Sequence, residues 1–197
     1  MKIDLTEIYK GLDEWRAERG ITAESQKEGY IVNVMEELGE LATALREYER
    51  FSKPSYPYQK NKKYAEHGII DALCDISVFT INAGTDVNCN EKIEIINTSQ
   101  TTRCNSSLSF LLSECGNFVY YGKFSSYVCF NQILLSCAKL CEQYGFDFQK
   151  AMDETIKEIS SRTGSYDENA KKWIKDTSDE TKAKWYKANY ELARIAQ

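Results

Sequence analysis

Two groups of acidic residues stand out by their spacing. Glu36, Glu37 and Glu40 fall within five consecutive positions, and Asp71 and Asp75 stand four positions apart. At about 100° per residue, Glu37 and Glu40 lie on one helix face beside its apolar stripe, and Glu36 is close to Glu40. Asp71 and Asp75 stack on one face of the next predicted helix, among mostly apolar neighbours. The spacing therefore predicts one acidic site shared by two neighbouring helices.

A divalent cation is the chemistry that best suits these acids. Ionised aspartates on an apolar helix repel each other and lose solvation, so Asp71 and Asp75 need a counter-charge. Mg²⁺ prefers carboxylate oxygens, with Mn²⁺ as a substitute, and it keeps water and substrate phosphates in its shell. The bound ion can neutralise a triphosphate and lower the pKa of a water, while a spare carboxylate accepts the proton.

Each acidic group also has a plainer interpretation. The pattern Glu-Glu-x-x-Glu is common on solvated helices, where it is surface charge. Exposure of the face that carries Asp71 and Asp75 would account for the aspartates in the same way. Because the two groups occur together, on helices joined by one loop, a shared acidic site is favoured over surface charge on each helix separately.

Capping boxes and helical periodicity predict the elements that must position the acids. The capping-box pairs are Asp4 with Glu7, Ser25 with Glu28 and Thr177 with Glu180. Helices are expected over residues 5–19, 25–50, 64–83, 107–121, 126–144, 147–161 and 177–193. The fold class that follows is all-α, a helical bundle.

Three connections separate these helices. Residues 52–63 hold both prolines and are expected to be a loop, as is the stretch 163–166. Residues 85–105 are expected to be a connection with some local structure, either a short strand or a helical turn. A pattern at residues 35–41 is similar to one at 112–118, which would pair two helical hairpins into a four-helix bundle, although chance similarity of amphipathic helices also explains it.

Composition excludes several other classes of protein. The 197 residues suit one domain, and the net charge of −5 disfavours a nucleic-acid groove or docking on an anionic membrane. The sequence has no run of 18 apolar residues, and no apolar core follows Lys2, so neither a membrane span nor a signal peptide is expected. Seven cysteines and a single histidine, without metal-ligand spacing, predict reduced cysteines acting as small hydrophobes in a cytoplasmic protein.

The two acidic segments together resemble a known superfamily. Residues 36–45 followed by residues 71–79 look like the all-α NTP pyrophosphatases, which include MazG-like proteins, dimeric dUTPases and phosphoribosyl-ATP pyrophosphohydrolases. The family motif is Glu-x-x-Glu on one helix and Glu-x-x-Asp on the next. Glu37 and Glu40 match the first half, whereas the second half departs from it, because Gly68 stands where a glutamate would precede Asp71.

The likeness covers residues 25–84 and 145–190. It implies a single MazG-like domain over residues 1–197, with residues 85–144 as a helical insertion and with a C-terminal helix. The implied activity is Mg²⁺-dependent hydrolysis of a nucleoside triphosphate, NTP or dNTP, to the monophosphate and pyrophosphate. The family also implies a homodimer, since its members usually build sites between subunits.

The resemblance carries roles over to particular residues. The metal ligands would be Glu37, Glu40, Asp71 and Asp75, with Glu36 as an outer-shell partner or a base. The phosphate contacts would be Arg162, Lys172 and Lys175, because a triphosphate needs more positive charge than the metal supplies. The weakest assignments concern a base pocket, which would be lined by Asn33 and Asn82 with aromatic residues such as Trp15 and Tyr30.

Two other functions remain open at this point. The altered second half of the motif favours a non-catalytic helical protein, which would bind a nucleotide or a partner chain through the same groove. A narrower enzyme, specific for one deoxynucleotide such as dUTP or dCTP, is the other alternative. Nucleotide binding without Mg²⁺ would indicate the first, and turnover of a nucleotide panel would identify the second.

Overall fold

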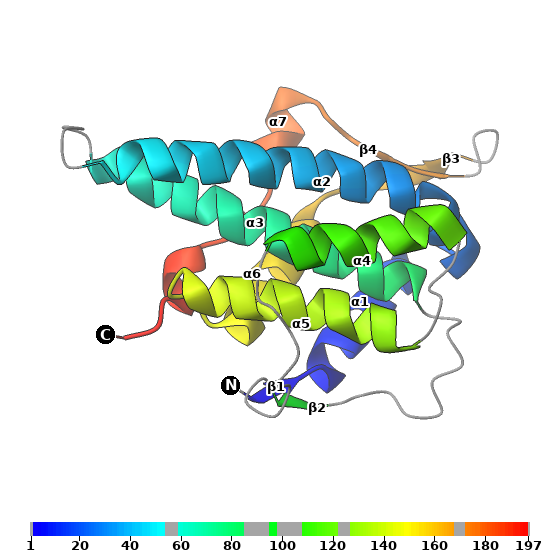
Figure 1. Cartoon of the computed structure of the whole chain (residues 1–197). Coiled ribbons are helices and arrows are strands. Elements are labelled where there is room, and N and C mark those ends of the chain that lie inside the picture. The colour runs from blue at the N-terminus through cyan, green and yellow to red at the C-terminus, as the bar shows by residue number, and fades with distance from the viewer. Residues whose placement is uncertain are drawn as a thin grey trace.

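A computed structural model of the chain shows a mostly helical protein (Figure 1). The part of the chain that it describes consists of residues 2–53, 59–84, 95–97, 108–121, 127–167 and 172–196. Within that part, no helix is long and apolar enough to cross a membrane.

The first two helices begin differently. Helix α1 spans Thr6–Glu18 with Leu5 at its N-cap position and no side-chain cap, while the predicted cap residue Asp4, one position earlier, accepts a hydrogen bond from the N–H of Thr6 at 2.9 Å. Helix α2 spans Ala23–Phe51 and is capped by Thr22, whose hydroxyl accepts from the N–H of Ser25 at 3.2 Å. The predicted cap at Ser25 is therefore wrong by one turn, since Thr22 takes the role three residues earlier.

Two helical hairpins form the body of the molecule. Helix α3, Gln59–Ala83, begins before the predicted residue 64 and packs along α2. Helices α4, Leu108–Tyr121, and α5, Tyr127–Gln143, form the second hairpin, which packs on the first through α3 with α5 and α2 with α4 (Figure 1). This is the arrangement of two hairpins that the similar patterns at 35–41 and 112–118 predicted.

Helix α6, Phe148–Ser161, closes the other side of α3. Its cap is the predicted one, since the Asp147 carboxylate accepts from the N–H of Lys150 at 3.1 Å. Helix α6 also packs against α1, so residues near both ends of the sequence meet beside α3.

Two short antiparallel strand pairs complete the regular structure. Strand β1, Lys2–Asp4, pairs with β2, Ile95–Asn97, within the region that was expected to hold some local structure. Strand β3, Gly164–Asp167, pairs with β4, Lys172–Lys175. The prediction of a loop at 163–166 is wrong, because a strand depends on a partner that lies outside any local window.

The predicted C-terminal helix over residues 177–193 is also wrong. The chain forms a short helix α7, Asp179–Lys182, and a 3₁₀ turn η1, Tyr190–Ala193, joined by an extended stretch. The backbone N–H groups of Ala188 and Asn189 donate to side chains of α6 at 2.8 and 2.9 Å. In a continuous helix those N–H groups would bond to carbonyls of the preceding turn instead.

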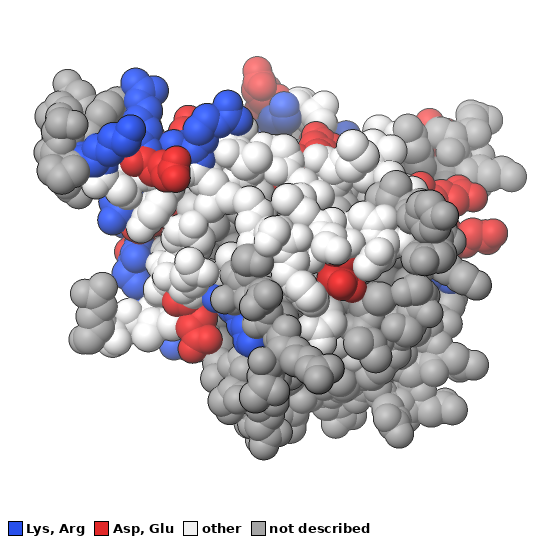
Figure 2. All heavy atoms as spheres, in the orientation of Figure 1, with Lys and Arg blue, Asp and Glu red and all other residues white. Residues whose placement is uncertain are grey.

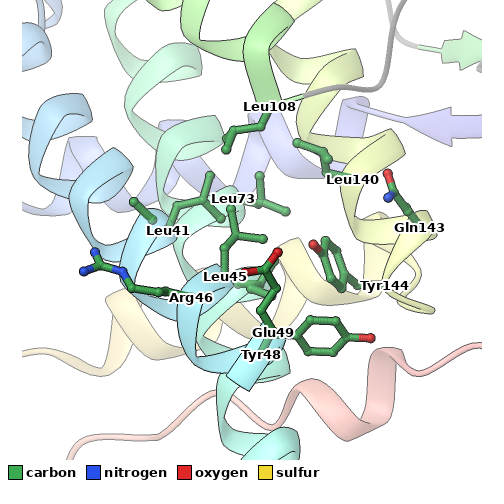
Figure 3. Close-up of a pocket in the computed structure, with 12 residues that line it drawn as sticks. Leu41, Leu45, Arg46, Tyr48, Glu49, Leu73, Leu108, Leu140, Gln143 and Tyr144 are labelled. Atoms are coloured by element: carbon green, nitrogen blue, oxygen red, sulfur yellow. The ribbon is translucent and has the colours of Figure 1, made fainter. Parts of the chain in front are cut away.

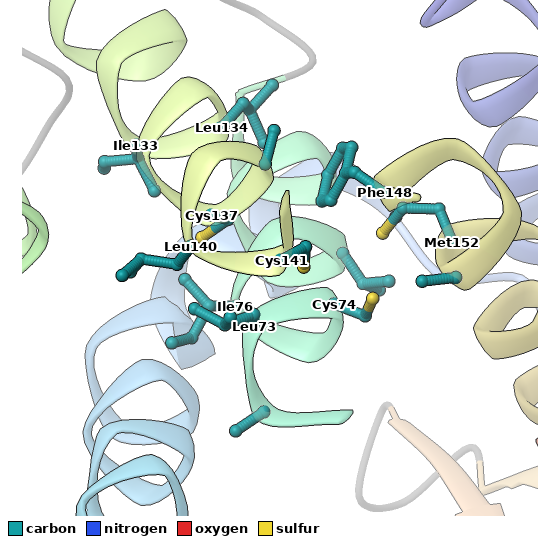
Figure 4. Close-up of a cluster of buried hydrophobic side chains, with 14 of the residues drawn as sticks. Leu73, Cys74, Ile76, Ile133, Leu134, Cys137, Leu140, Cys141, Phe148 and Met152 are labelled. Carbon is teal, nitrogen blue, oxygen red and sulfur yellow. The ribbon is translucent and has the colours of Figure 1, made fainter. Parts of the chain in front are cut away.

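One hydrophobic core joins the helices, with α3 at its centre. Figure 4 shows Leu73, Cys74 and Ile76 of α3 among side chains of α5 and α6. Helices α4 and α5 contribute many core residues, so the segment predicted as an insertion is part of the same core. The described cysteines Cys74, Cys115, Cys137 and Cys141 are buried and free, as small hydrophobic side chains would be.

The contact between α3 and α5 predicts a measurable effect of Gly84→Ala. A Cβ atom at position 84 would lie 2.4 Å from Cε2 of Phe130 and 3.1 Å from the backbone oxygen of Thr80. We expect a loss of about 1–3 kcal/mol in the free energy of unfolding, measured by urea denaturation, because the ring must shift in a packed core.

Gly116→Ala is the matched control, since nothing lies within 4 Å of a Cβ at that helical position. It should raise the free energy of unfolding by about 0.5–1 kcal/mol through helix propensity. Equal stability of the two variants would contradict the packing of Phe130 against Gly84.

Candidate active site

Five carboxylates from α2 and α3 share one electrostatic environment. Burial and the charges of four neighbouring carboxylates together raise the pKa of Glu37 to about 8, with burial as the largest cause. In order of their effect, these neighbours are Asp75, Glu40, Asp71 and Glu36. Because such repulsion falls off with distance, the other four carboxylates lie within electrostatic reach of Glu37. Glu36, Glu37, Glu40, Asp71 and Asp75 are called the acid cluster below.

The two aspartates differ in what surrounds them. The pKa of Asp75 is raised to about 7, first by burial and then by the charge of Asp71, while the charges of Arg162 and Lys175 oppose the rise. Burial also raises the pKa of Asp71, but Tyr190 opposes the rise by donating a hydrogen bond from its hydroxyl to Oδ1 at 2.6 Å. The acid cluster therefore holds more negative charge than its protein neighbours balance.

Two cationic side chains border the acid cluster on the side of Asp75. Arg162 follows directly after α6, and its Nη2 donates to Oε1 of Glu158 at 2.9 Å. Burial and the charge of Arg162 lower the pKa of Lys175, whereas Asp75, Glu36 and Glu37 raise it. Lys175 thus lies within electrostatic reach of both helices that carry the acids.

The β3–β4 hairpin brings Lys175 to this position. The backbone N–H of Asp176 donates to the oxygen of Thr163 at 2.9 Å, which extends the pairing beyond Gly164 and Lys175. A Cβ at Gly164 would lie only 2.2 Å from the backbone oxygen of Ile174, so the close approach of the strands requires glycine. Lys172, the third predicted phosphate contact, begins β4, but its side chain lies outside the described residues.

A cavity of about 420 Å³ opens beside Asp75, Arg162 and Lys175. Its lining also includes the amide of Asn33 and the rings of Trp15, Phe79 and Trp173. The guanidinium carbon of Arg19 lies 5.5 Å from the ring centroids of both tryptophans. The cavity therefore combines aromatic surface with positive charge at one end.

Arg19 fixes the part of the cavity lining that the ends of α1 and α6 form. Its Nη2 donates to the backbone oxygens of Ser160 and Arg162 at 2.9 and 3.1 Å. Trp15 donates from its indole nitrogen to the oxygen of Ile159 at 3.2 Å. These hydrogen bonds join the end of α1 to the end of α6, next to Arg162.

A second hollow, of about 400 Å³, includes three members of the acid cluster. It is formed by α2 and α3, and Glu36, Glu40 and Asp71 contribute to its lining with Thr43 and Tyr64. Members of the acid cluster therefore line two hollows, one aromatic and cationic and the other acidic.

A third hollow has different chemistry. It has a volume of about 610 Å³ and is lined mainly by apolar and aromatic side chains, including Leu41, Leu45, Leu140, Tyr48 and Tyr144 (Figure 3). No member of the acid cluster belongs to its lining. Its size alone does not make it the reactive site, because hydrolysis needs polar groups that converge on the substrate.

Carboxylates beside fixed cations suit a polyanion that binds together with a divalent cation. No known protein family, no curated protein and no solved structure matches this chain. Any functional assignment therefore depends on these side chains themselves.

Two residues predicted for a base pocket lie elsewhere. Asn82 is fully buried, and its side-chain oxygen accepts a hydrogen bond from Arg16 of α1. Tyr30 is also buried, with its hydroxyl 3.1 Å from that of Thr80. Neither residue is among those that line the cavity of about 420 Å³, since Asn82 is enclosed at Arg16 and Tyr30 at Thr80. Asn33 and Trp15, by contrast, line the cavity of about 420 Å³.

Glu158 of α6 belongs to the surroundings of the site, although the sequence analysis did not select it. Its charge raises the pKa of both Asp71 and Asp75. Its spacing of four from Glu154, on an amphipathic helix, is the signal that could have indicated it. Glu154 is almost fully buried, and it has the partners that a buried carboxylate needs, since Lys157, Tyr186 and Asn189 donate to it.

The acid cluster has the donors that a hard divalent cation needs. All five donors are carboxylates, and the raised pKa values of Glu37 and Asp75 result from burial and mutual repulsion that a cation would relieve. Among the described residues, no three histidine, cysteine or acidic side chains are already gathered closely enough to hold a metal ion. The donor type and the charge fit Mg²⁺.

Proposed function

We propose that this protein hydrolyses nucleoside triphosphates, NTP or dNTP, to the monophosphate and pyrophosphate in a Mg²⁺-dependent reaction. One observation carries the proposal. Burial together with the charges of four other carboxylates of α2 and α3 raises the pKa of Glu37 to about 8, and Arg162 and Lys175 line a cavity with Asp75. A cation together with a triphosphate would balance both sets of charges.

The residues of the proposed site would have three roles. Glu37, Glu40, Asp71 and Asp75 would hold the ion, for which Mn²⁺ is a substitute. When bound, Mg²⁺ supplies neutralisation of phosphate charge and activation of a water. Arg162 and Lys175 would bind phosphate oxygens, and Lys172 stays a prediction for the same task. Glu36, which is exposed, would accept the proton of the attacking water, with attack at the α–β linkage.

The aromatic cavity supports a nucleotide as the substrate. Trp15, Phe79 and Trp173 offer surfaces on which a base can stack, and Asn33 offers an amide that can pair with a base edge. Its volume of about 420 Å³ is in the range of small-molecule sites. This cavity adjoins the cations, so base and phosphates would lie in one continuous site.

A MazG-like homodimer is part of the same proposal. Val32 and Met35 of α2 are 69% and 63% exposed, and Leu112 of α4 is 46% exposed. Figure 2 shows few charged side chains over the middle of the face formed by α2, α4 and α5. Such a face favours contact with a second copy. A monomeric mass in sedimentation equilibrium would contradict this part.

The test is a pyrophosphate-release assay on a panel of NTPs and dNTPs. We expect release from at least one nucleotide in the presence of Mg²⁺, with none after chelation by EDTA, because the acid cluster needs the ion to accept a triphosphate. The products should be the monophosphate and pyrophosphate in equal amounts. Absence of release from every nucleotide, with both Mg²⁺ and Mn²⁺, would refute the proposal.

The non-catalytic alternative has one observation in its favour. Asp71 already shares one oxygen with Tyr190, and the sequence departs from the family motif at Gly68. A binding protein would take up nucleotide without Mg²⁺ and leave it intact in calorimetry. Preference for a single substrate in the same panel, such as dUTP or dCTP, would indicate the narrower enzyme.

A further inference from the structure

Residues 186–190, called the tail segment below, bind three carboxylates of α3 and α6. Tyr190 donates to Oδ1 of Asp71 at 2.6 Å. The backbone N–H of Ala188 donates to Oε2 of Glu158 at 2.8 Å. The hydroxyl of Tyr186 and the N–H of Asn189 both donate to Oε2 of Glu154. The tail segment therefore orients one member of the acid cluster and its neighbour Glu158.

Tyr190 reaches Asp71 from a buried position. Only 4% of Tyr190 is exposed, and its hydroxyl oxygen lies 3.0 Å from Oγ1 of Thr155. The hydroxyl of Thr155 donates to the backbone oxygen of Ala151 at 3.0 Å, which fixes its oxygen beside the Tyr190 hydroxyl. Tyrosine has one hydroxyl hydrogen, and Asp71 receives it, so the buried position of Tyr190 limits the rotation of Asp71.

The chain beyond the tail segment is fastened to the first half of α3. Oε1 of Glu191 lies 2.7 Å from Nε2 of His67, and Arg194 donates to Glu66 at 2.9 Å. Lys63 makes a longer ion pair with Glu191 at 3.6 Å. Tyr190 is thus held between α6 on one side and α3 on the other, which restricts its own movement.

We propose that Tyr190 is a positioning residue that couples docking of the tail segment to cation binding at Asp71. The inference rests on the cation site of the proposed function. With Oδ1 fixed by Tyr190, Asp71 can offer Oδ2 to the ion in a defined orientation. Outer-sphere partners of this kind typically change metal affinity by about 10–100-fold. The coupling is reciprocal, so the ion must also hold the tail segment in place.

The first test compares Tyr190→Phe with Tyr186→Phe by Mn²⁺ titration calorimetry in the absence of nucleotide. Both variants remove one tail hydroxyl that donates to a carboxylate, but only Tyr190→Phe changes the acid cluster. We expect Tyr190→Phe to bind Mn²⁺ about tenfold more weakly, and Tyr186→Phe to bind it as the wild type does. Equal or tighter binding by Tyr190→Phe would overturn the inference.

The second test measures the reciprocal effect by limited trypsin digestion. Lys184 and Lys187 are exposed sites in and beside the tail segment. Mn²⁺ should slow cleavage there in the wild type and in Tyr186→Phe, and it should have less effect in Tyr190→Phe. The same protection in all three proteins would contradict the coupling.

Two controls keep the outcomes separate. If Tyr190→Phe does not fold, Thr155→Val replaces it, because this change removes the oxygen that lies 3.0 Å from the Tyr190 hydroxyl and nearly preserves volume. It should also weaken Mn²⁺ binding. A wild type that binds no Mn²⁺ refutes the cation site and with it the proposed function. A wild type that binds Mn²⁺ and releases pyrophosphate, alongside a Tyr190→Phe variant that matches Tyr186→Phe, refutes only this inference.

Discussion

Glu37→Gln should lower the rate of Mg²⁺-dependent pyrophosphate release at least about 100-fold. The charges of the other four carboxylates all raise the pKa of Glu37, so we expect an ion in the acid cluster to interact with Glu37 directly. Glutamine keeps the shape of the side chain but provides a neutral oxygen, which a hard cation binds more weakly. The loss should be seen in kcat/KM at saturating Mg²⁺ for the preferred nucleotide.

The variant should not lose stability in the absence of metal. Burial and four like charges oppose ionisation of Glu37 in the folded protein, so a neutral side chain removes repulsion. Glu28→Gln, an exposed position on the same helix, is the matched control and should keep the activity of the wild type. Full activity in Glu37→Gln would remove the acid cluster from the reaction, whereas a lower Tm in EDTA would point to misfolding instead.

Raising the pH from 6 to 8 should tighten Mn²⁺ binding by about 100-fold or more, because the ion competes with protons. The pKa is about 8 for Glu37 and about 7 for Asp75, so at pH 6 both carboxyls hold protons that the ion must displace. Each such group contributes up to about tenfold per pH unit below its pKa. Calorimetric titration at several pH values in buffers of matched ionic strength measures the change.

The metal-free protein should show the opposite trend with pH. Ordinary carboxyls ionise near pH 4 when the chain is unfolded, whereas Glu37 and Asp75 keep their protons to about pH 7–8 when it is folded. Between these values the unfolded chain binds fewer protons, so the free energy of unfolding falls as pH rises. Thermal unfolding in EDTA from pH 5.5 to 8.5 should show a declining Tm, with a smaller decline in Glu37→Gln. A Tm that rises over this range would show that the acid cluster is already balanced by other charges.

Local sequence rules predicted most of the helices of this fold. The Asp147 cap is present, and the predicted helices over 5–19, 107–121 and 147–161 correspond closely to α1, α4 and α6. Caps and periodicity act within a few residues, so the sequence contains their signals directly. Residues 163–166 were mispredicted because β3 forms only by pairing with β4, and the region of residues 177–193 was mispredicted because its backbone bonds to side chains of α6, 30 and 35 positions earlier.

The residues of the candidate site likewise fall into those that local sequence patterns identified and those that only tertiary packing brought to the site. Sequence spacing alone placed Glu37 with Glu40 on one helix face and Asp71 with Asp75 on another, because helical geometry is local. Only the packing of α2 on α3 decided that these faces meet, and only α1 decided that Asn82 is enclosed while Asn33 lines a cavity. The role of Tyr190 was invisible in the sequence, since its hydrogen bond to Asp71 joins residues 119 positions apart. Only its spacing from Glu154 could have indicated Glu158, whose charge acts on Asp71 and Asp75 because α6 packs on α3. Residue types and local spacing therefore determined which chemistry the chain can offer, whereas tertiary packing decided which groups share one electrostatic environment, because charge interactions depend on distance in space and on burial.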